Sequence, residues 1–167
     1  MGGYGIQQLL SAMNYIFGES AISNMIQFSK NDKVDVLVFN SSVQKISGTV
    51  KGDNVYSLIE RLKSINASGT TSLYPSVSRA LELLKDEDSE EYNLSIIVMT
   101  DGVGNVGTYE EVRKTYKSVK KDIPIYSITF AEADEEQLKL LANLSNGKVF
   151  DGKNDLVKAF KTVRGYN

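Results

Sequence analysis

Apolar residues recur at intervals of three and four positions in several stretches of the chain, which is the spacing of one helix face. The first stretch runs from Ile6 to Phe17 and ends before Gly18. A shorter pattern of Ile22, Met25 and Ile26 predicts one or two further helical turns. The same spacing predicts later helices over residues 55–65, 77–84, 108–121, 134–145 and 156–163.

Two of the predicted helices carry recognisable start signals. Thr108 and Glu111 have the T-x-x-E spacing of a capping box, in which each side chain satisfies a backbone N–H of the first turn. Asp134 is an N-cap residue before the next helix, and Asn146-Gly147 is a typical helix end. We therefore expect helix boundaries close to these residues.

Apolar runs of strand length occur at Val34–Phe39, Leu94–Thr100 and Ile125–Phe130. Only Asp35 interrupts the first run, so we expect that strand to be covered on both faces. Shorter strands are expected over residues 43–50 and 148–150. Strands alternate with helices after residue 34, which indicates an α/β fold with a mostly parallel sheet. The length of 167 residues is that of one domain, which we expect to span residues 1–167.

The composition excludes several kinds of chemistry. The chain has neither Cys nor His, so any bound metal is a hard cation held by oxygen ligands. No Ser, Lys, Asp or Glu has the spacing of a nucleophile with its base, so we do not expect an enzyme. The net charge of −2 gives no general attraction to nucleic acid. No apolar run approaches the roughly 20 residues of a membrane helix, and residues 1–5 lack the basic start of a signal peptide. We expect a soluble domain and leave its parent's compartment open between cytoplasm and cell surface.

Candidate chemistry lies in loops at the ends of the predicted parallel strands, because ligands of such sheets bind at the strands' carboxyl ends. Asp101 comes directly after one strand and precedes a glycine-rich loop, and Ser68–Ser72 offers two Thr and two Ser hydroxyls. One carboxylate with neutral hydroxyls suits Mg²⁺, which keeps waters and needs only one or two carboxylates. A carboxylate from a partner can complete such a site. The residues alone favour the interpretation that Asp101 caps a turn and the hydroxyls cap a helix.

Three segments in order resemble landmarks of the von Willebrand factor A domain family. They are residues 31–41 (NDKVDVLVFNS), 69–74 (GTTSLY) and 98–102 (VMTDG). The resemblance covers essentially the whole chain. It implies a doubly wound, mostly parallel sheet with helices on both faces. It also implies protein binding or adhesion through a metal-ion-dependent adhesion site built from an Asp-x-Ser-x-Ser loop, a Thr loop and an Asp loop.

The resemblance carries over to two metal-site residues. Thr71 matches the family's Thr, with Thr70 as the competing register, and Asp101 matches the Asp of the third loop. The Asp-x-Ser-x-Ser loop has no match, and residues 1–5 resemble the segment on the C-terminal side of that loop in the family. We therefore expect a domain truncated before or within that motif, without the family's first central strand. Mg²⁺, or Mn²⁺ in its place, is then expected to bind weakly or not at all.

The missing strand has a structural consequence. Residues 34–39 and 94–100 would lose their shared neighbour, so we expect them to pair directly or to accept a strand from another chain, such as a second copy in a homodimer.

The resemblance implies that the partner is another protein, which offers an acidic side chain to the metal. Tyr74, Val103 and Asn105 would form the partner face around the site.

Two alternatives to a metal-dependent protein-binding domain stay open. One is an α/β enzyme that binds a nucleotide through the G-x-G-x-x-G of residues 102–107. Asp101, Glu110 and Glu111 would repel its pyrophosphate. The other is a metal-free scaffold domain.

Overall fold

The computed structural model describes residues 4–18, 21, 26–46, 48–65, 69–130 and 133–165. The chain divides into two compact units, which are described separately. One unit comprises Met1–Val38 with Gln44–Ser68, and the other comprises Phe39–Val43 with Gly69–Asn167. None of the described helices is long and apolar enough to cross a bilayer.

The second unit contains a parallel three-stranded sheet with the order β5-β6-β7. Its strands are β5 (Ile96–Thr100), β6 (Ile125–Thr129) and β7 (Val149–Asp151). Ile96 pairs with Ile125, and Ser127 pairs with Val149. Every residue of the central strand β6 is buried, because helices cover both faces of the sheet. The α/β fold with a parallel sheet is thus confirmed, with slightly shorter strands than predicted.

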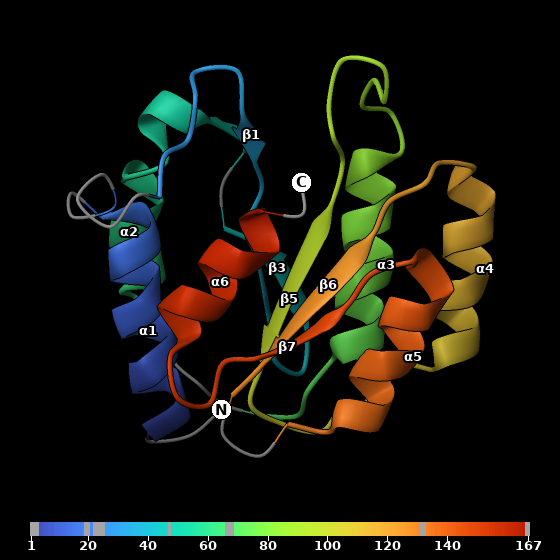
Figure 1. The fold of residues 1–167 in the computed structure, drawn as a ribbon. Helices are drawn as coiled ribbons and strands as arrows, with labels where there is room; N and C mark the ends of the chain where they lie inside the picture. The colour runs from blue at the N-terminus through green and yellow to red at the C-terminus, as the bar shows by residue number, and fades with distance from the viewer. Residues whose placement is uncertain are drawn as a thin grey trace. The chain divides into compact units, whose positions relative to one another are not determined.

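The helices of the second unit are α3 (Leu73–Leu84), α4 (Tyr109–Val119), α5 (Glu135–Ser145) and α6 (Leu156–Arg164). Figure 1 shows α3, α4 and α5 on one side of the sheet and α6 on the other. The predicted caps are confirmed: Thr108 and Glu111 form a capping box, and Asp134 caps α5. The largest fully buried side chains of the core against α3–α5 come from both strands and helices: Leu73, Val77, Leu81, Val112, Ile123, Ile125, Leu138 and Leu141.

The first unit contains α1 (Tyr4–Phe17), a 3-10 turn η2 (Gly52–Asn54) and α2 (Ser57–Leu62). The two helices pack against each other, and Ile16 and Leu58 are fully buried. The first predicted helix is therefore confirmed. Ile22 and Met25 lie outside the described residues, whereas Ile26 lies in no helix.

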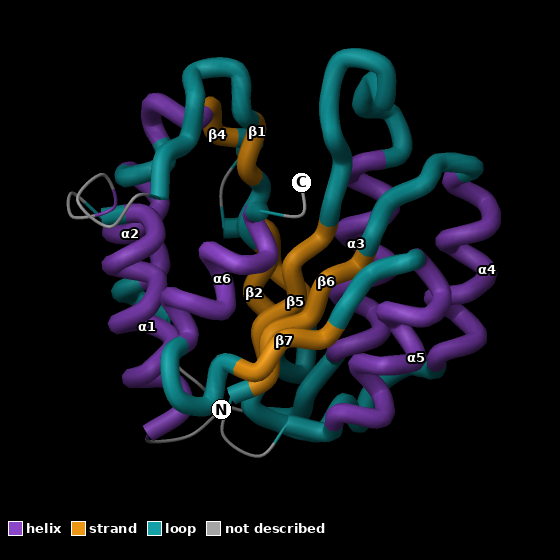
Figure 2. The backbone as a smooth tube through the Cα atoms, viewed as in Figure 1, coloured by secondary structure: helices purple, strands orange, loops and turns teal. Residues whose placement is uncertain are grey.

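The predicted strand Val34–Phe39 is wrong in its continuity and burial. It is split into β1 (Lys33–Val34) and β2 (Leu37–Phe39), and its residues are half-buried or exposed. The predicted strand over residues 43–50 is likewise split, into β3 (Val43–Lys45) and β4 (Val50–Lys51). Figure 2 labels β1, β2 and β4, and Figure 1 labels β3; β1 pairs antiparallel with β4, and β2 pairs with β3.

The polar side chain within the run explains the break. The Asp35 carboxylate lies 2.7 Å from Lys45 Nζ and accepts a 3.3 Å hydrogen bond from Thr49 Oγ1. A half-buried carboxylate needs such partners, and Asp35 and Val36 lie in no strand, which divides the apolar run.

Candidate functional site

The third-loop residue Asp101 comes directly after β5 and is half-buried. The turn around it is held by Thr100, which is 1% exposed. Thr100 Oγ1 accepts a hydrogen bond from Gly102 N–H and donates one to Gly102 C=O, each at 3.3 Å. The backbone on both sides of Asp101 is therefore fixed by its neighbours.

The loop of residues 69–72 is held by the tip of the β2–β3 connection. Ser41 Oγ accepts a hydrogen bond from Thr70 N–H at 3.0 Å, and Ser72 N–H donates to Asn40 C=O at 2.8 Å. Gly69 has φ +81°, and a Cβ atom there would lie 2.1 Å from Ser41 Oγ. A glycine is therefore required for this close approach.

A reciprocal pair of hydrogen bonds joins the two candidate loops. Thr71 N–H donates to Asn105 Oδ1 at 2.8 Å, and Asn105 N–H donates back to Thr71 C=O at 3.0 Å. A Cβ atom on Gly102 would lie 3.6 Å from Thr71 Oγ1, its nearest neighbour. The Thr71 hydroxyl thus lies beside the residue after Asp101, so the structure brings the two sequence-predicted site loops together.

A second reciprocal pair holds the same glycine-rich loop from α5. Gly104 N–H donates to Gln137 Oε1 at 2.7 Å, and Gln137 Nε2 donates to Gly104 C=O at 2.8 Å. Gly104 is buried, and the start of α3 lies close to it, since a Cβ atom there would lie 2.7 Å from Leu73 Cβ. Both backbone polar groups of Gly104 are therefore bound by one side chain.

The residues predicted to rim the site differ in their accessibility. Val103 is 52% exposed, between the two fixed glycines 102 and 104, whereas Tyr74 is only 7% exposed. Asn105 is exposed, but its side-chain oxygen accepts from Thr71. Val103 is therefore the apolar side chain that this loop presents to solvent.

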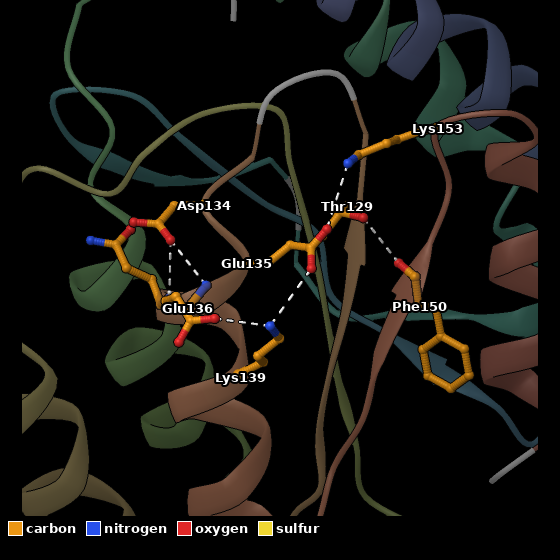
Figure 3. Close-up of polar contacts among 8 residues, drawn as sticks. Thr129, Asp134, Glu135, Glu136, Lys139, Phe150 and Lys153 are labelled. Carbon is orange, nitrogen blue, oxygen red and sulfur yellow. Dashed lines mark hydrogen bonds and ion pairs between the residues drawn. The ribbon is translucent and has the colours of Figure 1, made fainter.

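Negative charge lies near the buried tyrosine. Burial raises the pKa of Tyr74 above its ordinary value, and the charge of Asp134 and the nearby Tyr109 raise it further. Asp134 is fixed as the N-cap of α5 by accepting a 2.9 Å hydrogen bond from Glu136 N–H (Figure 3). Next to it, Glu135 lies 3.5 Å from Lys153 Nζ and 3.8 Å from Lys139 Nζ.

The donors fit a metal ion only in part. No group of three or more Asp, Glu, His or Cys side chains that could hold an ion occurs among the described residues. Asp101 supplies one carboxylate and Thr71 one hydroxyl. The Ser72 hydroxyl is buried at 1% exposure and has no hydrogen-bond partner in the described part of the chain.

Sequence reasoning missed three groups that shape this face. Thr100 has a local signal, since a Thr two positions before a Gly is typical of a side-chain turn. The Asn40 and Ser41 contacts and the Gln137 contact join residues about thirty positions apart, from 29 to 33. They leave no local pattern, because they depend on which loops the fold brings together.

Comparison with known proteins agrees with this architecture. Residues 1–162 match the family model of the von Willebrand factor type A domain. No curated protein matches the chain. A solved von Willebrand factor type A protein from Catenulispora acidiphila is similar in structure, with a TM-score of 0.75 and 13% identity. The match covers 96% of this chain but only 37% of that protein.

Two further solved structures are similar. An aerotolerance-related membrane protein from Bacteroides fragilis has a TM-score of 0.71 and 15% identity, over 96% of this chain and 86% of that one. Proximal thread matrix protein 1 from the mussel byssus, with a zinc-occupied MIDAS motif, has a TM-score of 0.66 and 14% identity. That match covers 95% of this chain and 42% of the byssus protein. At these identities the structural likeness shows the fold, whereas the family-model match spans nearly the whole sequence. The chain therefore belongs to the von Willebrand factor type A domain family.

Proposed function

We propose that this chain is a protein-binding module whose contact face is formed by residues 69–72 and 101–105. Membership of the family supports an interaction or adhesion role in general. The observation that carries the proposal is the reciprocal hydrogen bonding of Thr71 with Asn105, which joins the two loops that the resemblance implicates. Loops fixed in this way present their exposed side chains at little entropic cost on binding.

The metal at this face is proposed to be Mg²⁺, or Mn²⁺ in its place, bound weakly or not at all. Asp101 would hold the ion directly or through water, and the Thr71 hydroxyl would be a second ligand. The position of Thr71 Oγ1 beside Gly102 supports Thr71 over the competing Thr70 register. Since one carboxylate offsets little of the cost of dehydrating Mg²⁺, a carboxylate from the partner would complete the site.

The metal proposal is tested by thermal unfolding in rising Mg²⁺ or Mn²⁺. Wild type is compared with Asp101→Ala and with Asp53→Ala, a matched loss of a carboxylate from the other unit. We expect the melting temperature of all three proteins to respond alike. A dose-dependent rise of several degrees that only Asp101→Ala loses would show a functional site and contradict the weak-site proposal.

The contact face is tested by NMR titration with short peptides that carry a single Glu or Asp, in the presence of Mg²⁺. We expect amide shifts to cluster at Thr71, Val103 and Asn105, and Val103→Asp to abolish them. Leu140→Asp is the control, because Leu140 is also an exposed apolar residue, at 43%, but lies on α5. Shifts that are absent, or that Val103→Asp leaves intact, would reject this face.

The homodimer is a further proposal about assembly. Among the described residues, β5 is paired on one side, with β6. A strand from a second copy could pair with its other edge. Sedimentation analysis at several protein concentrations tests this, since a concentration-independent monomer would exclude it.

The loop geometry supports the nucleotide-binding alternative less well than the protein-binding proposal. The backbone of Gly104 is already bound by Gln137, and the first turn of α4 is capped by Thr108 and Glu111. A pyrophosphate would have to displace these groups and face two glutamates. Stabilisation of the domain by a dinucleotide in thermal unfolding would revive this alternative.

A further inference from the structure

The glycine-rich loop after β5 is fixed by side chains from three different elements. Thr100 at the end of β5 binds Gly102, Asn105 within the loop binds Thr71, and Gln137 on α5 binds Gly104. Thr100 and Asn105 belong to the strand end and the loop itself. Gln137 differs from these two residues, because it lies on a helix and is 33 positions further along the chain than Gly104.

The side-chain amide of Gln137 forms hydrogen bonds with both backbone polar groups of Gly104, as a neighbouring β-strand would. Its oxygen accepts from the N–H and its nitrogen donates to the C=O, at 2.7 and 2.8 Å. A carboxamide is the side-chain group that offers both a donor and an acceptor in this arrangement. A Cβ atom on Gly104 would lie 2.7 Å from Leu73 Cβ and 3.0 Å from Gln137 Oε1, so α3 and α5 both lie close to this glycine.

The next residue along the chain is Asn105, which binds both the N–H and the C=O of Thr71. Gln137 therefore fixes Gly104, the residue immediately before Asn105, and Asn105 is the residue that joins the two loops. We propose that Gln137 is a positioning residue, which holds the glycine-rich loop so that Asn105 can bind Thr71 and set it beside Gly102. The biological meaning of this inference rests on the proposed function, but the contacts that it concerns are those of the free protein.

The test is amide hydrogen exchange by NMR without metal or partner, on wild type, Gln137→Met and Lys139→Met. Methionine is unbranched and of similar length to glutamine, but it cannot form the reciprocal pair. Lys139 lies on the same helix and contacts Glu135 and Glu136 at its exposed end, so its variant controls for changes in α5. Exchange at Ile128 in β6 reports on global unfolding.

We expect Gln137→Met to speed exchange at Gly104, and also at Thr71 and Asn105, by about three- to tenfold, the loss of roughly one hydrogen bond's protection. Lys139→Met should leave these amides unchanged. Gln137→Glu is a second variant that keeps an acceptor for Gly104 N–H but sets a carboxylate oxygen against Gly104 C=O, so it should also speed exchange at these amides.

Unchanged exchange at Thr71 in Gln137→Met would overturn the proposal, whether or not Gly104 itself responds. An equal effect of Lys139→Met would also overturn it. Failure of wild type to bind acidic peptides would instead reject the proposed function, because the exchange measurement uses neither metal nor peptide. The two failures are therefore distinguishable.

Discussion

The two glycines that flank Val103 differ in what surrounds them. At Gly104 a Cβ atom would lie 2.7 Å from Leu73 Cβ and 3.0 Å from Gln137 Oε1, whereas at Gly102 the nearest atom would be 3.6 Å away. We expect Gly104→Ala to lower the free energy of unfolding by about 1–3 kcal/mol, the usual cost of overpacking. Gly102→Ala, the matched control, should change it by less than about 0.5 kcal/mol. Urea denaturation measures both, and equal effects would contradict this account of the loop.

The buried Tyr74 phenol is expected to make the stability of the domain fall at alkaline pH. Burial, then Asp134 and Tyr109, raise the pKa of Tyr74 in the folded state. The unfolded chain then loses its phenolic proton first, near the ordinary pKa of about 10. The stabilisation is therefore complete below that pH and is lost as the pH rises towards the folded-state pKa.

This response can be measured by thermal unfolding between neutral and strongly alkaline pH. Wild type should lose stability more steeply than Tyr74→Phe above about pH 10. Tyr15→Phe is the control, because Tyr15 is 47% exposed. Parallel pH profiles of Tyr74→Phe and wild type would contradict a raised pKa of Tyr74 in the folded state.

At the scale of elements, the capping box of α4 makes a quantitative prediction. Thr108 Oγ1 accepts from Glu111 N–H, and the Glu111 carboxylate accepts from Thr108 N–H at 2.7 Å. Thr108→Ala should lower the free energy of unfolding by about 1 kcal/mol. Thr115→Ala removes a hydroxyl from the interior of the same helix and should be neutral or slightly stabilising, since alanine favours helix. Comparable losses of unfolding free energy in Thr108→Ala and Thr115→Ala would show that the capping box does not cause the destabilisation.

The C-terminal end of α3 is stabilised by a cation. Lys121 Nζ donates to the carbonyl oxygens of Lys85 and Glu87, just beyond the last turn of the helix. Lys85 is the C-cap residue of α3, so the ammonium lies next to the negative end of the helix dipole. Lys121→Met should therefore lower the unfolding free energy by about 1 kcal/mol, and the loss should shrink at high salt. Lys114→Met, at an exposed position in the middle of α4, serves as the control in the same denaturation series.

Elements with a strong local signal were predictable from sequence, and those that depend on tertiary partners were not. The helices α3, α4 and α5 can be predicted from their apolar spacing and from the caps at Thr108 and Asp134. The continuous strand over residues 34–39 was wrong because Asp35 takes Lys45 and Thr49 as partners, which no local pattern reveals. The candidate site shows the same division. Asp101 and Thr71 could be proposed from their motifs, whereas Gln137 required the structure.

At the scale of the whole molecule, the two kinds of sheet differ sharply in burial. The central strand β6 is buried along its whole length and paired on both sides, with β5 and β7. The pairs β1–β4 and β2–β3 are two or three residues long, and their residues are half-buried or exposed. Short, half-exposed pairs can open without exposing much apolar surface, whereas opening β6 exposes the core on both faces.

Native-state hydrogen exchange should therefore separate the two groups. We expect amides of Tyr126, Ser127 and Ile128 to exchange only through global unfolding, with a urea dependence equal to that of the whole protein. Amides of Val34 and Val50 should exchange through local opening, faster and with little dependence on urea. The same urea dependence for both groups would mean that the two units unfold as one cooperative body. A shallow urea dependence for β6 would instead show that the parallel sheet is not the most stable part of the domain.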